Sequence, residues 1–98
     1  MRTMFLGAYH FDGDPAALLP AYDKLLAAYA GDVDLHVCVV RGDGITVFDA
    51  CPSAEQFRAF SGGADFAAAL AGAGLPAPRT EEVGDVHVAR LREEATTS

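Results

Sequence analysis

Apolar residues fill most positions of two short runs within residues 33–51, and the segment between the runs contains Gly42 and Asp43. Two β-rich runs around a Gly-Asp-Gly turn are a strong local signal for a β-hairpin. If Gly42 and Asp43 are the two central turn residues, His36 faces Asp49 across the strands. The pattern therefore predicts a hairpin with a defined register.

The predicted hairpin is apolar on both faces, because side chains alternate between the faces of a strand. One face carries Leu35, Val37, Val39, Thr46, Phe48 and Ala50. The other face carries His36, Cys38, Val40, Ile45, Val47, Asp49 and Cys51. A strand pair of this kind needs a covering layer on each side. We expect helices to cover the first face.

The N-terminal part of the chain predicts a strand followed by a helix. Residues 4–11 are apolar on both parities and predict the strand. Asp14 is a favourable N-cap, and Pro15 suits the first helical position. Pro20 predicts a kink or a late helix start, and Gly31 predicts the end of the helix. At helical spacing this segment carries Leu18, Leu19, Tyr22, Leu25, Leu26 and Tyr29.

The C-terminal half predicts a helix in two pieces and a last strand. Ser53 and Gln56 form a capping box that starts the first piece. A Ser-Gly-Gly segment breaks the helix, which resumes over residues 64–73. An extended connector at 74–78 leads to a strand at 83–91. The expected inward residues of the two helical pieces are Phe57, Phe60, Phe66 and Leu70.

The element order predicts an α+β fold of the ferredoxin-like type, βαββαβ, with a four-stranded antiparallel sheet and both helices on one face. Residues 1–91 form this single domain, and residues 92–98 form a polar C-terminal tail. The second sheet face would be bare and apolar, so we expect a second copy to cover it and to complete a dimeric α/β barrel. The expected dimer face carries Cys38, Val40, Ile45 and Val47. The expected core consists of Tyr22, Leu25, Leu26, Val37, Val39, Phe48, Phe57 and Phe60.

Composition and charge narrow the range of partners. The 98 residues suffice for one domain with one core, and the formal net charge is −7 with only 7 Lys and Arg residues. Nucleic acid and anionic membrane surfaces are therefore unexpected partners. No apolar run approaches the roughly 20 residues of a membrane span. Without a secretory segment, and with two cysteines outside any spaced framework, we expect a cytoplasmic location.

His36 and Asp49 are the first candidates for catalysis. A carboxylate beside an imidazole fixes the tautomer and raises the basicity of the ring, which suits a general base. The alternative is a structural pair that is buried and satisfied at an interface.

The remaining candidates also lie on predicted strands, and the face to which each points decides whether it can join a site. His87 has the parity of the uncovered face and is a third catalytic candidate, or else an exposed residue near a strand end. Tyr9 and His10 point to opposite faces, so only one of them can line a given cavity. The expected ligand-binding residues are Tyr9, His10, Cys38, Val40 and Val47.

The cysteines and histidines predict neither a metal site nor a cofactor. Cys51 precedes the Ser53 helix start, which would favour a thiolate, although Cys38 and Cys51 also fit as small buried hydrophobic residues. The three histidines match no known ligand spacing. The acidic balance disfavours haem, and no glycine-rich phosphate loop precedes a helix.

Four segments carry a family resemblance: Leu35-His36-Val37-Cys38-Val39, Phe48-Asp49-Ala50-Cys51-Pro52, Ala73-Gly74-Leu75-Pro76-Ala77-Pro78 and Gly84-Asp85-Val86-His87. They resemble small actinobacterial proteins of the dimeric α/β-barrel superfamily, which includes antibiotic-biosynthesis monooxygenase-like and stress-responsive barrel proteins. The resemblance spans residues 4–91 and implies chemistry in a cavity between sheet and helices or in the barrel mouth. Monooxygenase-type members use Asn and Trp, which this chain lacks, whereas cyclase-type members use His and Tyr, which it has.

Two functions follow from these patterns. The first is a cofactor-independent enzyme, of cyclase, isomerase or monooxygenase type, which acts as a homodimer on an apolar or aromatic metabolite of secondary metabolism. His36 would be its base, Asp49 would orient His36, and His87 or Tyr9 would bind a developing oxyanion. The alternative is a dimeric module that binds a metabolite or only packs, without catalysis.

Overall fold

The computed structural model describes residues 3–28 and 35–90. Predictions for Tyr29, for Gly31, for the hairpin before Leu35 and for the tail at 92–98 lie outside the described residues. The elements are β1 (Phe5–Asp12), α1 (Pro15–Ala28), β2 (Leu35–Arg41), β3 (Gly44–Cys51), α2 (Ala54–Ser61), α3 (Ala64–Ala73) and β4 (Arg79–Asp85).

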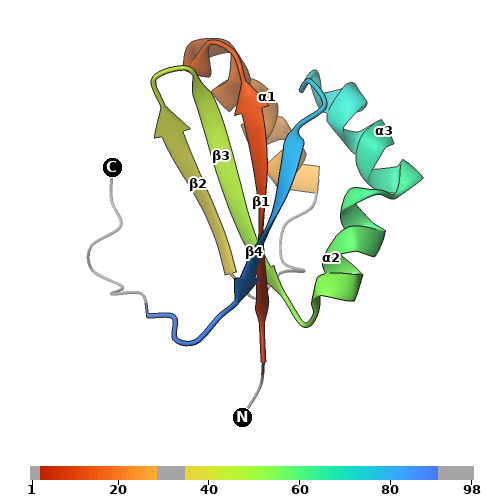
Figure 1. Ribbon diagram of the computed structural model, residues 1–98. Helices are drawn as coiled ribbons and strands as arrows, with labels where there is room; N and C mark the ends of the chain where they lie inside the picture. The colour runs from red at the N-terminus through yellow and green to blue at the C-terminus, as the bar shows by residue number, and fades with distance from the viewer. Residues whose placement is uncertain (1–2, 29–34, 91–98) are drawn as a thin grey trace.

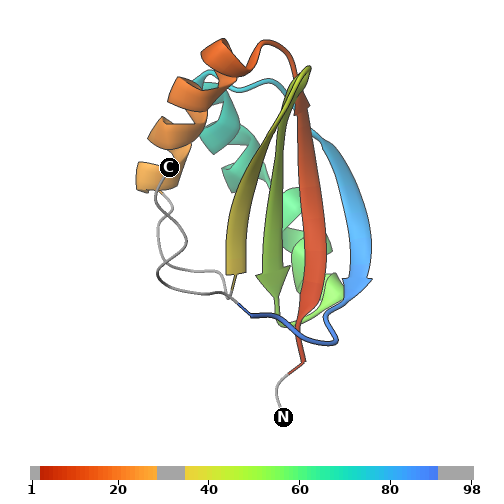
Figure 2. The same ribbon diagram turned by 90° about the vertical axis from the view of Figure 1, so that its left-hand side faces the viewer.

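The strands form one antiparallel sheet in the order β2-β3-β1-β4 (Figure 1). The three helices in the described part of the chain lie on one side of this sheet (Figure 2). The prediction of an α+β fold with a four-stranded antiparallel sheet is confirmed, and the arrangement is compatible with the ferredoxin-like type.

The predicted hairpin register is confirmed. Arg41 pairs with Gly44 and His36 pairs with Asp49, so Gly42 and Asp43 form the turn between β2 and β3. The two-residue turn sets this register, because it decides which positions lie opposite one another along the whole ladder.

The assignment of the two hairpin faces is wrong. Ile45 and Val47, expected at a dimer interface, are buried beneath the helices with relative exposures of 0% and 4%. Val37 and Val39, expected in the core, lie on the opposite face and are about two-fifths exposed. We call this opposite side of the sheet the open face. It carries Leu6, Ala8, His10, Leu35, Val37, Val39, Thr46, Phe48 and Ala50.

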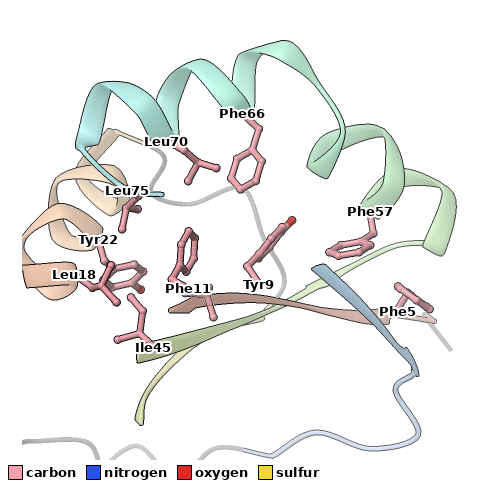
Figure 3. Close-up of a cluster of buried hydrophobic side chains, with 11 residues drawn as sticks. Phe5, Tyr9, Phe11, Leu18, Tyr22, Ile45, Phe57, Phe66, Leu70 and Leu75 are labelled. Carbon is pink, nitrogen blue, oxygen red and sulfur yellow. The ribbon is translucent and has the colours of Figure 1, made fainter. Parts of the chain in front are cut away.

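The aromatic residues of β1 decide which face the helices cover. Phe5, Tyr9 and Phe11 share one parity and pair with Cys51, Val47 and Ile45 of β3. These rings need a deep apolar layer, whereas the other parity of β1 offers only smaller or polar side chains. The core that results comprises Phe5, Tyr9, Phe11, Leu18, Tyr22, Ile45, Val47, Phe57, Phe66, Leu70 and Leu75 (Figure 3). Phe60 and Leu26, also expected in the core, are exposed.

The starts of α1 and α2 match the predicted N-caps. The Asp14 side chain accepts a hydrogen bond from the Ala16 N–H, and α1 begins at Pro15. The helix continues through Pro20, so a late start is wrong. At the second helix the Ser53 hydroxyl accepts from the Gln56 N–H at 3.1 Å.

The predicted bounds of the last strand are wrong. β4 covers Arg79–Asp85 instead of residues 83–91, and a bulge lies opposite the step from Leu6 to Gly7. Nearly all its side chains are exposed, so main-chain pairing with β1 decides its position and apolar alternation carries little information. His87 consequently lies beyond the strand.

Candidate functional site

His36 and Asp49 form the centre of the candidate site. The Nδ1 atom of His36 lies 2.5 Å from Oδ1 of Asp49. Only 26% of the histidine side chain and 15% of the aspartate side chain are exposed. Because the two residues pair directly across β2 and β3, the hairpin register alone brings them together. This contact is the one that the sequence predicted.

Helix α1 adds a third member, Tyr22. Its hydroxyl lies 2.5 Å from Nε2 of His36, and the two rings are within 8° of parallel. Burial, then the nearby Cys38 and Asp49 groups, raise the pKa of Tyr22 to about 12. Tyr22 therefore stays a neutral phenol across the physiological range. We call Tyr22, His36 and Asp49 the triad.

The aspartate determines the direction of both hydrogen bonds in the triad. An ionised carboxylate only accepts hydrogen bonds, so Nδ1 of His36 carries the proton that it donates to Asp49. In neutral His36, Nε2 is then an acceptor, and the Tyr22 O–H donates to it. This arrangement can take up one proton at Nε2, where the Asp49 carboxylate stabilises the resulting imidazolium.

Tyr9 lies on the same side of the sheet as the triad. It is 3% exposed, and its ring packs between Phe57 and Phe66 with centroid separations of 5.4 and 5.1 Å. Figure 3 shows its hydroxyl directed away from the sheet toward the helices. Burial raises the pKa of Tyr9 strongly, and the charge of Asp49 raises it further.

The other expected ligand-binding residues on this face differ in burial. Val47 is buried, and Cys38 is half-buried against the core. Val40 lies near the hairpin turn and is 56% exposed. Burial and the charge of Asp23 raise the pKa of the Cys38 thiol, which disfavours a nucleophilic thiolate. The Cys51 thiol donates to the Ser53 carbonyl at 3.3 Å, a contact of its protonated form.

His10 lies on the open face, away from the triad. Its Nδ1 is 3.0 Å from the Thr46 hydroxyl, and its Nε2 is 2.9 Å from a Glu81 carboxylate oxygen. Thr46 also accepts from Nε of Arg41 at 2.8 Å. His10 thus belongs to a polar chain across the sheet, and the structure does not bring it together with Tyr9.

His87 does not join the triad. It is exposed and follows β4, which lies at the opposite sheet edge from β2. Within residues 3–28 and 35–90, no hydrogen bond or ion pair connects it to His36 or Asp49.

The sequence pattern predicts Tyr22 in the core but does not predict its contact with His36. One signal was present: a buried tyrosine hydroxyl needs a polar partner, and Tyr22 lies on the apolar stripe of α1. The reversed hairpin faces hid this partner, because they put His36 on the side away from the helices.

Other features of the described residues give no second site. No group of three or more His, Cys, Asp or Glu side chains there could hold a metal ion. No helix in that part of the chain is long and apolar enough to span a membrane. A shallow surface hollow at the junction of α2 and α3 is lined by Ala59, Phe60, Gly63, Ala64, Asp65 and Phe66, which offer little chemistry.

Comparison of the chain with protein-family models, curated proteins and solved structures finds no match.

Proposed function

We propose that this chain is a small-molecule-binding homodimer of the α/β-barrel type that catalyses cofactor-independent proton transfer on an apolar or aromatic metabolite. Cyclisation, isomerisation and oxygenation all begin with such a step. The observation that carries the proposal is the position of His36, held between Asp49 and Tyr22 at 2.5 Å on each side.

The surroundings of the triad suit an apolar ligand with one polar group. Apolar and aromatic side chains of β1, β3 and the helices form the same layer. A few convergent polar groups in an apolar wall are the usual composition of a ligand site. Proton transfer there is favoured because the negative Asp49 offsets the positive charge that forms on His36.

The homodimer in this proposal uses the open face. No described helix covers that face, and Val37 and Val39 are about two-fifths exposed there. On this face Ala8 pairs with Phe48 and Leu6 pairs with Ala50, so its middle is an apolar surface on which another sheet can pack. The triad would then work within each protomer, between sheet and helices, and not in the shared interior.

A second candidate, a non-catalytic metabolite-binding or structural dimeric module, is favoured by one observation. Both nitrogens of His36 already have protein partners, so the triad is internally satisfied. On this alternative the triad only ties α1 to β2 and β3.

Hydrogen–deuterium exchange at the α-carbon of acetophenone, followed by NMR in deuterated buffer, tests the proposal. This probe is an apolar aryl ketone whose exchange needs a base. We expect the protein to accelerate the exchange, His36→Ala to abolish the acceleration, and Asp49→Asn to weaken it less. Asp65→Asn, which removes an exposed carboxylate on α3, is the matched control and retains it.

Thermal melts of the same variants separate the two candidates. The catalytic role predicts lost exchange in folded protein. A structural pair instead predicts no acceleration by the wild type and a stability loss of about 3–5 kcal/mol in either variant, because one buried partner is left unpaired. That second result would contradict the proposal.

A further inference from the structure

The hydrogen bonds of His36 leave it no nitrogen for a ligand. Nδ1 is bound to Asp49, and Nε2 is bound to the Tyr22 hydroxyl. A ligand could meet His36 directly only if the Tyr22 side chain moved away. Tyr22 is 7% exposed and belongs to the core, so such a movement would disturb the packing of α1.

The Tyr22 oxygen, in contrast, can still accept a hydrogen bond. A phenol oxygen has one proton to donate and lone pairs to accept with. The proton is used toward His36, and no second hydrogen bond of this hydroxyl is found among the described residues. These lone pairs are therefore an unused acceptor at the end of the line from Asp49 through His36 to Tyr22.

We infer that Tyr22 is the catalytic residue that meets the ligand, taking a proton from an acidic hydroxyl while it passes its own proton to His36. In this step the ligand O–H bond breaks and a new O–H bond forms at Tyr22. The original Tyr22 O–H bond breaks and an N–H bond forms at Nε2. The products are the ligand anion and an imidazolium paired with Asp49. The inference rests on the proposed function and names its ligand class, a neutral phenol or enol.

The charges around Tyr22 support both the relay and the ligand class. Burial and the groups Cys38, Asp49 and Asp23 disfavour a phenolate at Tyr22, which keeps its pKa high. Because the Tyr22 phenol does not ionise by itself, it can accept the proton of the ligand only when it donates its own proton to His36 in the same step. The carboxylates of Asp49 and Asp23 would repel a carboxylate ligand, so a neutral hydroxyl compound fits better.

Binding of 4-nitrophenol, whose anion is yellow, tests the relay. At a pH below that at which the free probe ionises, we expect wild-type protein to bind it and to produce the yellow anion. Tyr22→Phe keeps the ring in the core and removes only the hydroxyl. We expect it to bind the probe, to remain folded in a thermal melt, and to lose at least ten-fold of the anion signal.

A second variant makes failure of the inference distinguishable from failure of the proposed function. His36→Gln should also lose the signal, and Asp65→Asn should retain it. If Tyr22→Phe still ionises the probe while His36→Gln does not, His36 acts directly and only the inference is overturned. If the wild type does not ionise the probe while it still exchanges acetophenone, the ligand class is wrong. If it does neither, the proposed function falls with the inference.

Discussion

The protonation of Tyr22 is coupled to folding. Its pKa rises from 10.0 to about 12 in the folded chain, with burial as the main cause. The folded state therefore favours the protonated phenol. A raised pKa gives stability that is fully present below the unfolded pKa and is lost as the pH rises through the folded one. The pH window for Tyr22 is thus about 10 to 12.

We predict that Tyr22→Phe flattens the alkaline loss of stability. Urea unfolding between pH 9 and about 12, followed by circular dichroism, measures the effect. The wild type should lose free energy of unfolding steeply in this window, and the variant less steeply. Some loss remains, because the pKa of Tyr9 is also raised. Equal slopes for both proteins would contradict a raised pKa of Tyr22 in the folded state.

At the scale of elements, the β2–β3 hairpin shows what a sequence pattern can and cannot decide. Gly42 and Asp43 identify the turn, and the turn fixes the register that joins His36 to Asp49. The apolar pattern, however, is nearly equal on both faces, so it cannot say which face the helices cover. The missing information lies in β1, where Tyr9 and the other aromatic rings share one parity. The third triad member could not be predicted while the faces were reversed.

Two phenylalanines on opposite faces test this assignment. We predict that Phe11→Ala costs about 3–5 kcal/mol, because this side chain is 2% exposed under the helices. Phe48→Ala, on the open face and only partly buried, should cost clearly less in the monomer. Urea unfolding at low protein concentration measures both. A larger cost at Phe48 would reverse the faces again.

At the scale of the whole molecule, the helices of residues 3–28 and 35–90 cover one face of the sheet and leave the open face without a helix (Figure 2). The α+β class and the antiparallel sheet followed from the order of apolar segments, which depends little on which face is inward. The bounds of β4 could not be predicted from the order of apolar segments. Its residues are mostly exposed, and main-chain pairing with β1 determines their position. Quaternary structure depends on the faces, so the reversal moves the expected dimer contact to the open face.

We predict that Val39→Asp yields a monomer while Val40→Asp remains a dimer. These neighbours point to opposite faces and are 41% and 56% exposed, so we expect the two substitutions to have similar effects on the stability of the isolated chain. Only Val39→Asp would place an unpaired carboxylate in the proposed interface, and the two-fold symmetry would place two of them there. Size-exclusion chromatography with light scattering at micromolar concentration measures the mass. A wild-type monomer, or equal behaviour of the two variants, contradicts the dimer through the open face.

Because His36 lies on β2, the triad depends on a strand that can open before the rest of the molecule unfolds. β2 is an edge strand with β3 as its one neighbour in the sheet, so it can separate without opening the β1 ladders. Edge elements of this kind exchange their amide hydrogens through local openings that need less free energy than global unfolding. Each such opening would part His36 from Asp49 and Tyr22 while the aromatic core stays closed. Mild heat or denaturant should therefore disconnect the triad before the molecule melts, with the amides of β2 exchanging faster than those of β1.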